Sequence, residues 1–201
     1  MVATRLAQHA DRPVEYNWHV GERAHLVLYV PLPALDEVVD PYRHPGALPA
    51  HVTVWPPWSG DCDLSQPNGT VFAATRCCAG WDADFFTVSW FGRRVVILQP
   101  RHPDPFHELR TRLGDPPHPG GAQARPFVPH VTVATRWPHV HLREAARWAD
   151  THLPLRVPVT DVALARRDNV AHAWVEVCRW SLREPSATTA GPGRDTPSTP
   201  Q

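Results

Sequence analysis

Short runs of hydrophobic and polar residues follow one another along this chain, and each run has the period of one strand or one helix. β-branched or alternating runs predict strands, whereas apolar residues three or four positions apart predict helices. We expect strands at 25–30, 51–54, 84–91, 94–99, 129–133, 156–166 and 171–180, and helices at 34–40, 70–79, 105–114 and 140–152. Turns at 92–93 and 168–169 each join two of these strands, and such tight turns require antiparallel pairing.

The order of these elements predicts an α+β fold. Each half of the chain holds one copy of a repeated tetrapeptide on a strand, together with a helix and further strands. We therefore expect a bilobal, pseudo-symmetric duplication with two antiparallel sheets, flanking helices and a central cleft. The helix at 105–114 has a proline at its start and a glycine at its end. Phe106, Leu109 and Leu113 are expected to form its buried stripe.

The two ends of the chain differ in composition from its middle. Residues 1–23 are polar and aperiodic, which predicts an N-terminal extension. From residue 184 the composition narrows to Ser, Thr, Pro and Gly, which predicts a disordered tail at 184–201. The folded domain is expected at 24–183. The sequence has no apolar signal segment and no membrane-length apolar stretch, and this favours a cytoplasmic protein without a membrane anchor.

The tetrapeptide His-Val-Thr-Val occurs twice, at 51–54 and at 130–133. Side chains alternate between the two faces of a strand, so the His and Thr of each copy share one face and the two valines share the other. The valines are expected in the core. Two such strands facing one cleft would offer two imidazoles and two hydroxyls to a single substrate.

This pair of H-x-T motifs resembles that of the two-histidine (2H) phosphoesterase superfamily, which includes the 2'-5' RNA ligase-like proteins and cyclic phosphodiesterases. The resemblance extends over about residues 24–183. It includes the segment 50–57, the hairpin at 85–99, and the loop at 116–121 with the second motif that follows it. The resemblance implies the bilobal fold, catalytic roles for His51 and His130, and phosphate contacts for Thr53 and Thr132.

The same four residues suit the opening of a cyclic phosphodiester. That reaction requires a deprotonated nucleophile, a protonated leaving oxygen and stabilisation of the charged phosphoryl oxygens. Two histidines with pKa values near 6.5 can hold opposite protonation states near neutral pH, so one acts as general base and the other as general acid. The threonine hydroxyls can donate hydrogen bonds to the non-bridging oxygens. The sequence does not assign the base and the acid to particular histidines.

Three further residues are candidate substrate contacts. Strand alternation places Arg136 and Trp55 on the face of the motifs, where a guanidinium would neutralise phosphate and an indole would stack on a base. Phe127, just before the second motif, is a similar candidate. The alternative is a solvated arginine and aromatic side chains that pack on neighbouring turns.

Charge and metal-ligand spacing limit the alternatives. The 20 basic and 20 acidic residues give a formal net charge of zero, so any phosphate recognition must be local, and a small cyclic nucleotide or an RNA terminus is favoured over long RNA. The four cysteines form no C-x-x-C pair, and the H-x-H at 139–141 has no carboxylate at a ligand-like spacing.

We therefore expect a monomeric, metal-independent cyclic phosphodiesterase without a cofactor, with 2'-5' RNA joining as the reverse reaction. One alternative is a non-catalytic module that binds a phosphorylated ligand or RNA end in the same cleft. The other is a metal hydrolase, which a chelator would inhibit.

Overall fold

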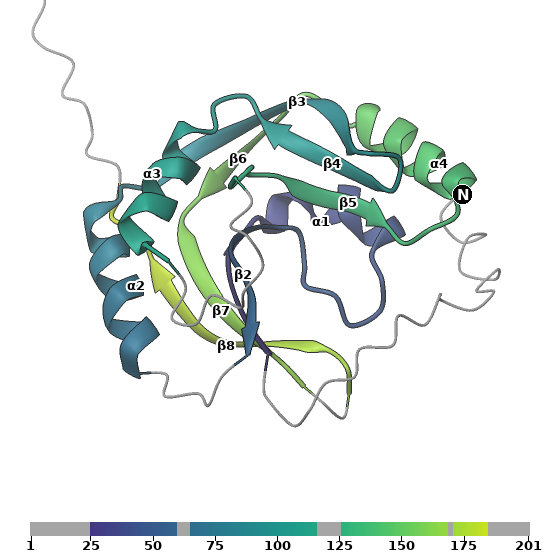
Figure 1. Ribbon diagram of the computed structural model, residues 1–201. Coiled ribbons are helices and arrows are strands. Elements are labelled where there is room, and N and C mark those ends of the chain that lie inside the picture. The colour runs from purple at the N-terminus through teal and green to yellow at the C-terminus, as the bar shows by residue number, and fades with distance from the viewer. Residues whose placement is uncertain (1–24, 60–64, 116–125, 169–170, 185–201) are drawn as a thin grey trace, which may run out of the picture.

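The computed structural model of the chain describes residues 25–59, 65–115, 126–168 and 171–184 (Figure 1). The extension predicted at 1–23 and nearly all of the predicted tail lie outside the described residues. The strands are β1 (His25–Pro31), β2 (His51–Ser59), β3 (Trp81–Phe91), β4 (Val95–Pro100), β5 (Val131–Thr135), β6 (Leu155–Val159), β7 (Asp161–Arg167) and β8 (Trp174–Ser181). The helices are α1 (Asp36–Val39), α2 (Ser65–Cys77), α3 (Asp104–Leu113) and α4 (His139–Asp150).

The four helices confirm the expected helical segments, with shifted boundaries. The largest shift is in α2, which begins at Ser65 rather than at residue 70. Its Pro67 lies in the first turn, where a backbone N–H has no intrahelical partner to lose. α3 buries Phe106, Leu109 and Leu113 as predicted. None of the described helices is long and apolar enough to cross a membrane.

All eight described strands belong to one antiparallel sheet, in the order β6-β3-β4-β5-β2-β1-β7-β8. The α+β class and the antiparallel pairing are confirmed, but the prediction of two separate sheets is wrong. β2 and β5, which carry the two tetrapeptides, pair directly where Val52 opposes Val131. This pairing joins the two halves of the chain into one sheet. The pseudo-symmetric duplication of the halves stays a prediction.

The sheet is curled so far that its two ends approach each other (Figure 1). Only Thr160 separates the last residue of β6 from the first residue of β7. Yet β6 is the edge strand at one end of the order, and β7 is next to the edge at the other. Consecutive Cα atoms are about 3.8 Å apart, so only a curled sheet can satisfy both facts. The single strand predicted at 156–166 is therefore wrong, because the chain changes neighbours at Thr160.

The two faces of the sheet bury different sets of side chains. One face packs against all four helices and forms the main core, to which β1 contributes Leu26, Leu28 and Val30. The intervening residues of β1 point to the other, concave face. There Val27 and Tyr29 join Ala163, Ala165 and Leu48 in a small second cluster. This alternation along β1 and β7 leaves the concave face available for a binding site.

Candidate active site

The pairing of β2 with β5 brings the two H-x-T motifs together. Val52 and Val131 are opposite each other. Both are fully buried on the core face, as predicted. In this antiparallel register His51 lies across from Thr132, and Thr53 lies across from His130. Each histidine is thus the cross-strand neighbour of the other motif's threonine. All four side chains are only partly buried.

The two imidazoles are held by the same hydrogen bond. Nδ1 of His51 lies 2.7 Å from the carbonyl oxygen of Pro49, and Nδ1 of His130 lies 2.7 Å from that of Val128. A carbonyl accepts only, so Nδ1 carries the proton and donates it in both rings. Nε2 is then the free nitrogen, able to accept or to give up a proton. Both histidines therefore present the same atom for acid–base chemistry.

Each imidazole also contacts the edge or face of one aromatic ring. The ring centroids of Tyr29 and His51 are 5.5 Å apart, and those of Phe91 and His130 are 4.7 Å apart. Both pairs are T-shaped. Tyr29 is buried and its hydroxyl donates a 2.9 Å hydrogen bond to Glu176 of β8. Phe91, at the tip of the β3–β4 hairpin, is 38% exposed. These two aromatic residues were not predicted from the sequence.

The surroundings lower the pKa of both histidines below the ordinary value. Burial is the main cause for His51, and the charge of His130 lowers its pKa further. The hydrogen bond to Pro49 and the carboxylate of Asp36 act in the opposite direction. For His130, burial lowers the pKa and the hydrogen bond to Val128 opposes it.

A one-residue β-bulge follows the threonine in both motif strands. In β2 the register moves from Tyr29↔Thr53 to Leu28↔Trp55, which leaves Val54 as the extra residue. In β5 it moves from Ile97↔Thr132 to Val96↔Ala134, which leaves Val133 extra. A bulge shifts the alternation of side chains beyond it. Predictions that assumed uninterrupted alternation beyond the threonines must therefore be checked against the structure.

Trp55 is the residue that this shift affects most. It is 1% exposed within the main core, and its indole N–H donates a 2.9 Å hydrogen bond to the carbonyl of Gly114. A ring without an accessible face cannot stack on a base, so the predicted substrate contact is wrong. Phe127 does not reach the pocket either. It is half-buried, contacts the ring of His107 on α3, and is not among the residues that line the pocket.

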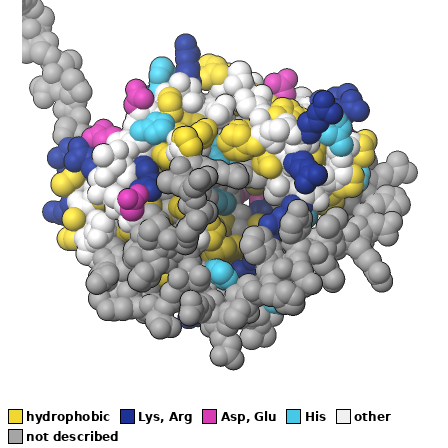
Figure 2. All heavy atoms as spheres, viewed as in Figure 1, with side chains coloured by type: hydrophobic (Ala, Val, Ile, Leu, Met, Phe, Trp, Pro, Cys, Tyr) yellow, Lys and Arg dark blue, Asp and Glu magenta, His cyan; other side chains and the backbone are white. Residues whose placement is uncertain are grey.

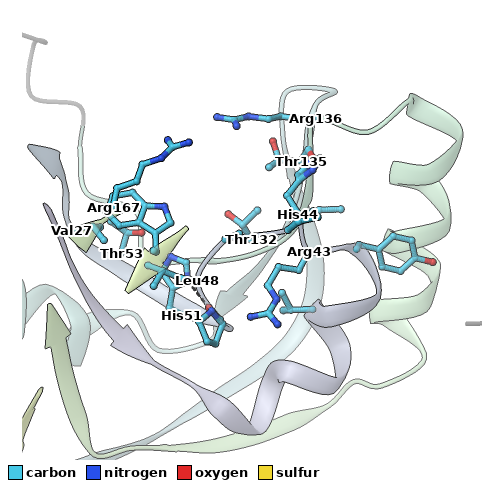
Figure 3. A pocket seen from close by; sticks show the side chains of 18 of the residues that line it. Val27, Arg43, His44, Leu48, His51, Thr53, Thr132, Thr135, Arg136 and Arg167 are labelled. Atoms are coloured by element: carbon cyan, nitrogen blue, oxygen red, sulfur yellow. Dashed lines mark hydrogen bonds between the residues drawn. The ribbon is translucent and has the colours of Figure 1, made fainter. Parts of the chain in front are cut away.

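A pocket of about 420 Å³ opens on the concave face beside the motifs (Figure 3). His51, Thr53 and Thr132 line it, together with Arg136 and the segment 42–49. Figure 2 shows histidine and arginine side chains at and beside a hollow in the middle of this face. The pocket therefore adjoins three of the four predicted motif residues and includes the predicted Arg136.

The segment 42–49 contacts residues that follow or end β5 on one side and the start of β8 on the other. His44 stacks on Trp137, and its Nε2 lies 2.8 Å from the carbonyl oxygen of Thr135. Gly46 accepts a hydrogen bond from the backbone N–H of Trp174 and has a φ of +75°. A Cβ at Gly46 would lie 3.0 Å from the carbonyl oxygen of His172. Glycine thus allows this wall to pack closely against the start of β8.

Sequence reasoning missed the opposite wall of the pocket, which contains Val27, Arg167 and Trp174. Alternation along the predicted strand at 25–30 places Val27 on the face opposite the core, but β7 was not predicted to pair with β1. The H-x-H at 139–141 lies at the start of α4. Among the described residues, no group of three His, Cys, Asp or Glu side chains is placed to share a metal ion.

Comparison with known proteins places this arrangement in a family. The sequence model of the 2'-5' RNA ligase superfamily matches residues 18–171. Among solved structures, E. coli LigT in apo form is similar with a TM-score of 0.57 at 20% identity, covering 82% of this chain and 100% of LigT. LigT complexed with 3'-AMP gives a TM-score of 0.53 at 19% identity, covering 81% of this chain and 100% of LigT.

LigT complexed with ATP gives a TM-score of 0.52 at 20% identity, covering 82% of this chain and 100% of LigT. No match was found among curated proteins. Likeness at these identities concerns the fold, whereas the family match spans most of the sequence and includes both motif strands. The protein therefore belongs to the 2'-5' RNA ligase superfamily of two-histidine phosphoesterases.

Proposed function

We propose that this protein is a metal-independent phosphodiesterase that opens 2',3'-cyclic phosphates by acid–base catalysis with two histidines. The observation that carries the proposal is the matched pair of Nδ1 hydrogen bonds, which leaves Nε2 free in both His51 and His130. His51 lines the pocket, and His130 lies across from Thr53, which also lines it. Two free imidazole nitrogens on adjacent strands supply the proton acceptor and the proton donor that the reaction requires.

In this mechanism one imidazole removes a proton from the attacking water, and the water oxygen forms the new bond to phosphorus. The other imidazole protonates the ribose oxygen as its bond to phosphorus breaks. Thr53 and Thr132 donate hydrogen bonds to the non-bridging oxygens, which gain charge in the transition state. The crossed register supports these roles, because each hydroxyl lies across from the histidine of the other motif.

The substrate class follows from the ligands that such a pocket accommodates. A volume of about 420 Å³ suits a mononucleotide or the last nucleotide of an RNA end. LigT has been crystallised with 3'-AMP and with ATP, and the proposal extends nucleotide binding to this chain. The 5'-hydroxyl of a second RNA end can take the place of water as the nucleophile. The phosphorus–O3' bond then breaks and a 2'-5' linkage forms, so RNA joining belongs to the proposal.

The test is turnover of 2',3'-cyclic nucleotides with a chelator present, by wild type, His51→Ala and His130→Ala. The wild type should remain active, and each variant should lose roughly 10²–10⁴-fold in kcat. His102→Ala is the matched control, because His102 is exposed and lies away from the pocket. Full activity of either motif variant would contradict the mechanism.

Two other outcomes identify the alternatives. Loss of wild-type activity in chelator, restored by added divalent metal, indicates a metal hydrolase. Ligand binding that survives in both histidine variants, without turnover by wild type on cyclic or 2'-5'-linked substrates, indicates a non-catalytic binding module. Both outcomes would overturn the proposed function.

A further inference from the structure

The mouth of the pocket carries positive charge that the two H-x-T motifs do not explain. The charged side chains that line the pocket are Arg43, Arg136 and Arg167, and no Asp or Glu is among the lining residues that the structure describes. The formal net charge of the whole chain is zero. The excess of arginine is therefore local to this pocket, where it favours an anion.

Two of the three arginines have no anionic partner in the described part of the protein. Arg43 forms a 3.1 Å ion pair with Asp40. Arg136 and Arg167 form no ion pair with any described carboxylate, as is true of several arginines elsewhere in the described part of the chain. The two arginines at the pocket mouth are thus available to a ligand.

These two arginines come from opposite sides of the pocket. Arg136 follows β5 directly, and Arg167 ends β7. Figure 3 shows both guanidinium groups above the level of Thr132 and His51, extending over the opening from either side. A ligand phosphate held at the motifs would therefore lie deeper in the pocket than the two guanidiniums.

Backbone geometry supports a functional reason for this placement. Among the described residues, the only non-glycine positions with positive φ are Arg136 at 63° and His172 at 51°. Both residues line the pocket. Such conformations are unfavourable for residues with a Cβ, and they persist where the surrounding structure requires a particular side-chain direction. Arg136 has this conformation at the position that directs its side chain over the opening.

Arg167 is oriented by its neighbours on the sheet. It lies on the same face of β7 as Ala163 and Ala165, so its side chain leaves the sheet on the concave side. Trp174, its cross-strand partner on β8, lines the pocket beside it. Arg166, the preceding residue, points to the opposite face and is exposed without lining the pocket.

We propose that Arg136 and Arg167 bind a second phosphate group of the substrate. The preferred ligand then carries its cyclic phosphate at the H-x-T motifs and another phosphate, attached through the same nucleoside, at the pocket mouth. Guanidinium groups suit this role because they form bidentate, charge-assisted hydrogen bonds with phosphate oxygens. The inference rests on the proposed function, since that function assigns the first phosphate to the motifs.

Three substrates separate the sources of the second phosphate. They are adenosine 2',3'-cyclic phosphate, the same nucleotide with an added 5'-phosphate, and an adenosine dinucleotide that ends in the same cyclic phosphate. Wild type should turn over the second or the third substrate, or both, with a kcat/KM at least about tenfold above the first, because one or two charge-assisted hydrogen bonds are gained. A preference for the third alone identifies an internucleotide phosphate, and a preference for the second alone identifies a terminal one.

The variants Arg136→Ala and Arg167→Ala should each remove most of this preference, mainly by raising KM for the substrates with two phosphates. Arg167→Lys should restore part of it, because the charge returns without the bidentate geometry. Arg166→Ala is the control and should keep both the wild-type preference and the wild-type activity.

Equal kcat/KM values for all three substrates with wild type would overturn the inference. So would equal losses on all three substrates in Arg136→Ala and Arg167→Ala, since those indicate a general effect on the pocket. If wild type turns over none of them, the proposed function fails and binding decides the inference separately. Adenosine 3',5'-bisphosphate should then bind wild type at least about tenfold more tightly than 3'-AMP, and Arg167→Ala should lose that difference. Equal affinities of wild type for adenosine 3',5'-bisphosphate and 3'-AMP would overturn the inference.

Discussion

The two H-x-T motifs have the same local backbone geometry, but the side chains around them differ. In both motifs the imidazole Nδ1 donates to the carbonyl two residues earlier, and a one-residue bulge follows the threonine. The side chains beside the two rings are different. His51 lies against a buried tyrosine, whereas His130 lies against a ring that is 38% exposed.

The ring beside His51 is part of a network of polar contacts. The hydroxyl of Tyr29 donates to Glu176, and Glu176 in turn accepts hydrogen bonds from Arg179. This network crosses β1, β7 and β8, so the His51 side of the site is tied to one end of the sheet. Phe91 has no polar group to anchor it. Local backbone thus sets the orientation of both imidazoles, whereas only the ring beside His51 has a hydrogen bond to a more distant strand.

Substitution of the two motif threonines should have the largest effect on activity, and it tests whether the two motifs are equivalent. Thr53→Val and Thr132→Val should each reduce kcat by about 10²–10³-fold, the range seen when one donor to a transition-state oxyanion is removed. Thr→Ser at either position keeps the hydroxyl and should retain most activity. Steady-state kinetics on a 2',3'-cyclic nucleotide measures both. A large loss of kcat at only one position would show that the two threonine hydroxyls have different roles.

A stability measurement should separate the two aromatic neighbours. Tyr29→Phe removes the hydrogen bond to Glu176 and should lower the free energy of unfolding by about 1–2 kcal/mol. Phe91→Tyr, the reverse exchange at an exposed ring, should change it by no more than about 0.5 kcal/mol. Urea unfolding with the midpoint and the slope recorded measures both differences. Equal changes would show that the network around Tyr29 adds no stability.

The smallest effect concerns pH. The pKa values of both histidines are lowered, so activity should be highest on the acid side of the ordinary histidine pKa of 6.5. Asp36 raises the pKa of His51. Asp36→Asn removes that charge and keeps an acceptor for the N–H of Ala50. The limb of the pH profile that His51 controls should move to lower pH.

The control for this shift is Asp150→Asn, which removes an exposed carboxylate from the last residue of α4. It should leave the profile of kcat/KM against pH unchanged. A shift to higher pH in Asp36→Asn would mean that the carboxylate acts on His51 by some route other than its charge.

Folding stability should also depend on pH, and it should fall in mild acid. A histidine whose pKa is lowered in the folded state resists protonation there, so it contributes no destabilisation above pH 6.5. As pH falls below the ordinary value, the unfolded chain binds the proton first and the folded state loses stability. His51 and His130 therefore both contribute to a loss of stability in mild acid.

Local periodicity predicted the secondary structure and the motif faces well. The hairpin at 84–99, the buried stripe of α3 and the buried valines of both tetrapeptides all follow from the spacing of apolar residues. These features depend on a few neighbouring residues, which the sequence displays directly. The direct pairing of Val52 with Val131 was not predicted, because the two motif strands were expected in separate sheets.

Features that depend on distant pairing were not predictable in the same way. The bulge at Val54 turns Trp55 into the core, but no residue in the motif marks it. The division at Thr160 reflects two sets of partners, with β3 on one side and β1 and β8 on the other. Arg167 escaped notice because its position depends on that division. The burial of Trp55, the division at Thr160 and the position of Arg167 are specified only by the pairing of strands in the folded sheet.

The connection at Thr160 also determines how the site can move. Enzymes with two separate lobes often admit a ligand by hinge opening and then close around it. Here the motif strands are bonded to each other within one sheet, and a single residue links regions near the two ends of that sheet. The curled sheet therefore has its two end regions linked through one residue, which favours a site of fixed width over hinge opening. The spacing of the two histidine Nε2 atoms is therefore expected to depend on the pairing of β2 with β5, and not on a hinge between two lobes.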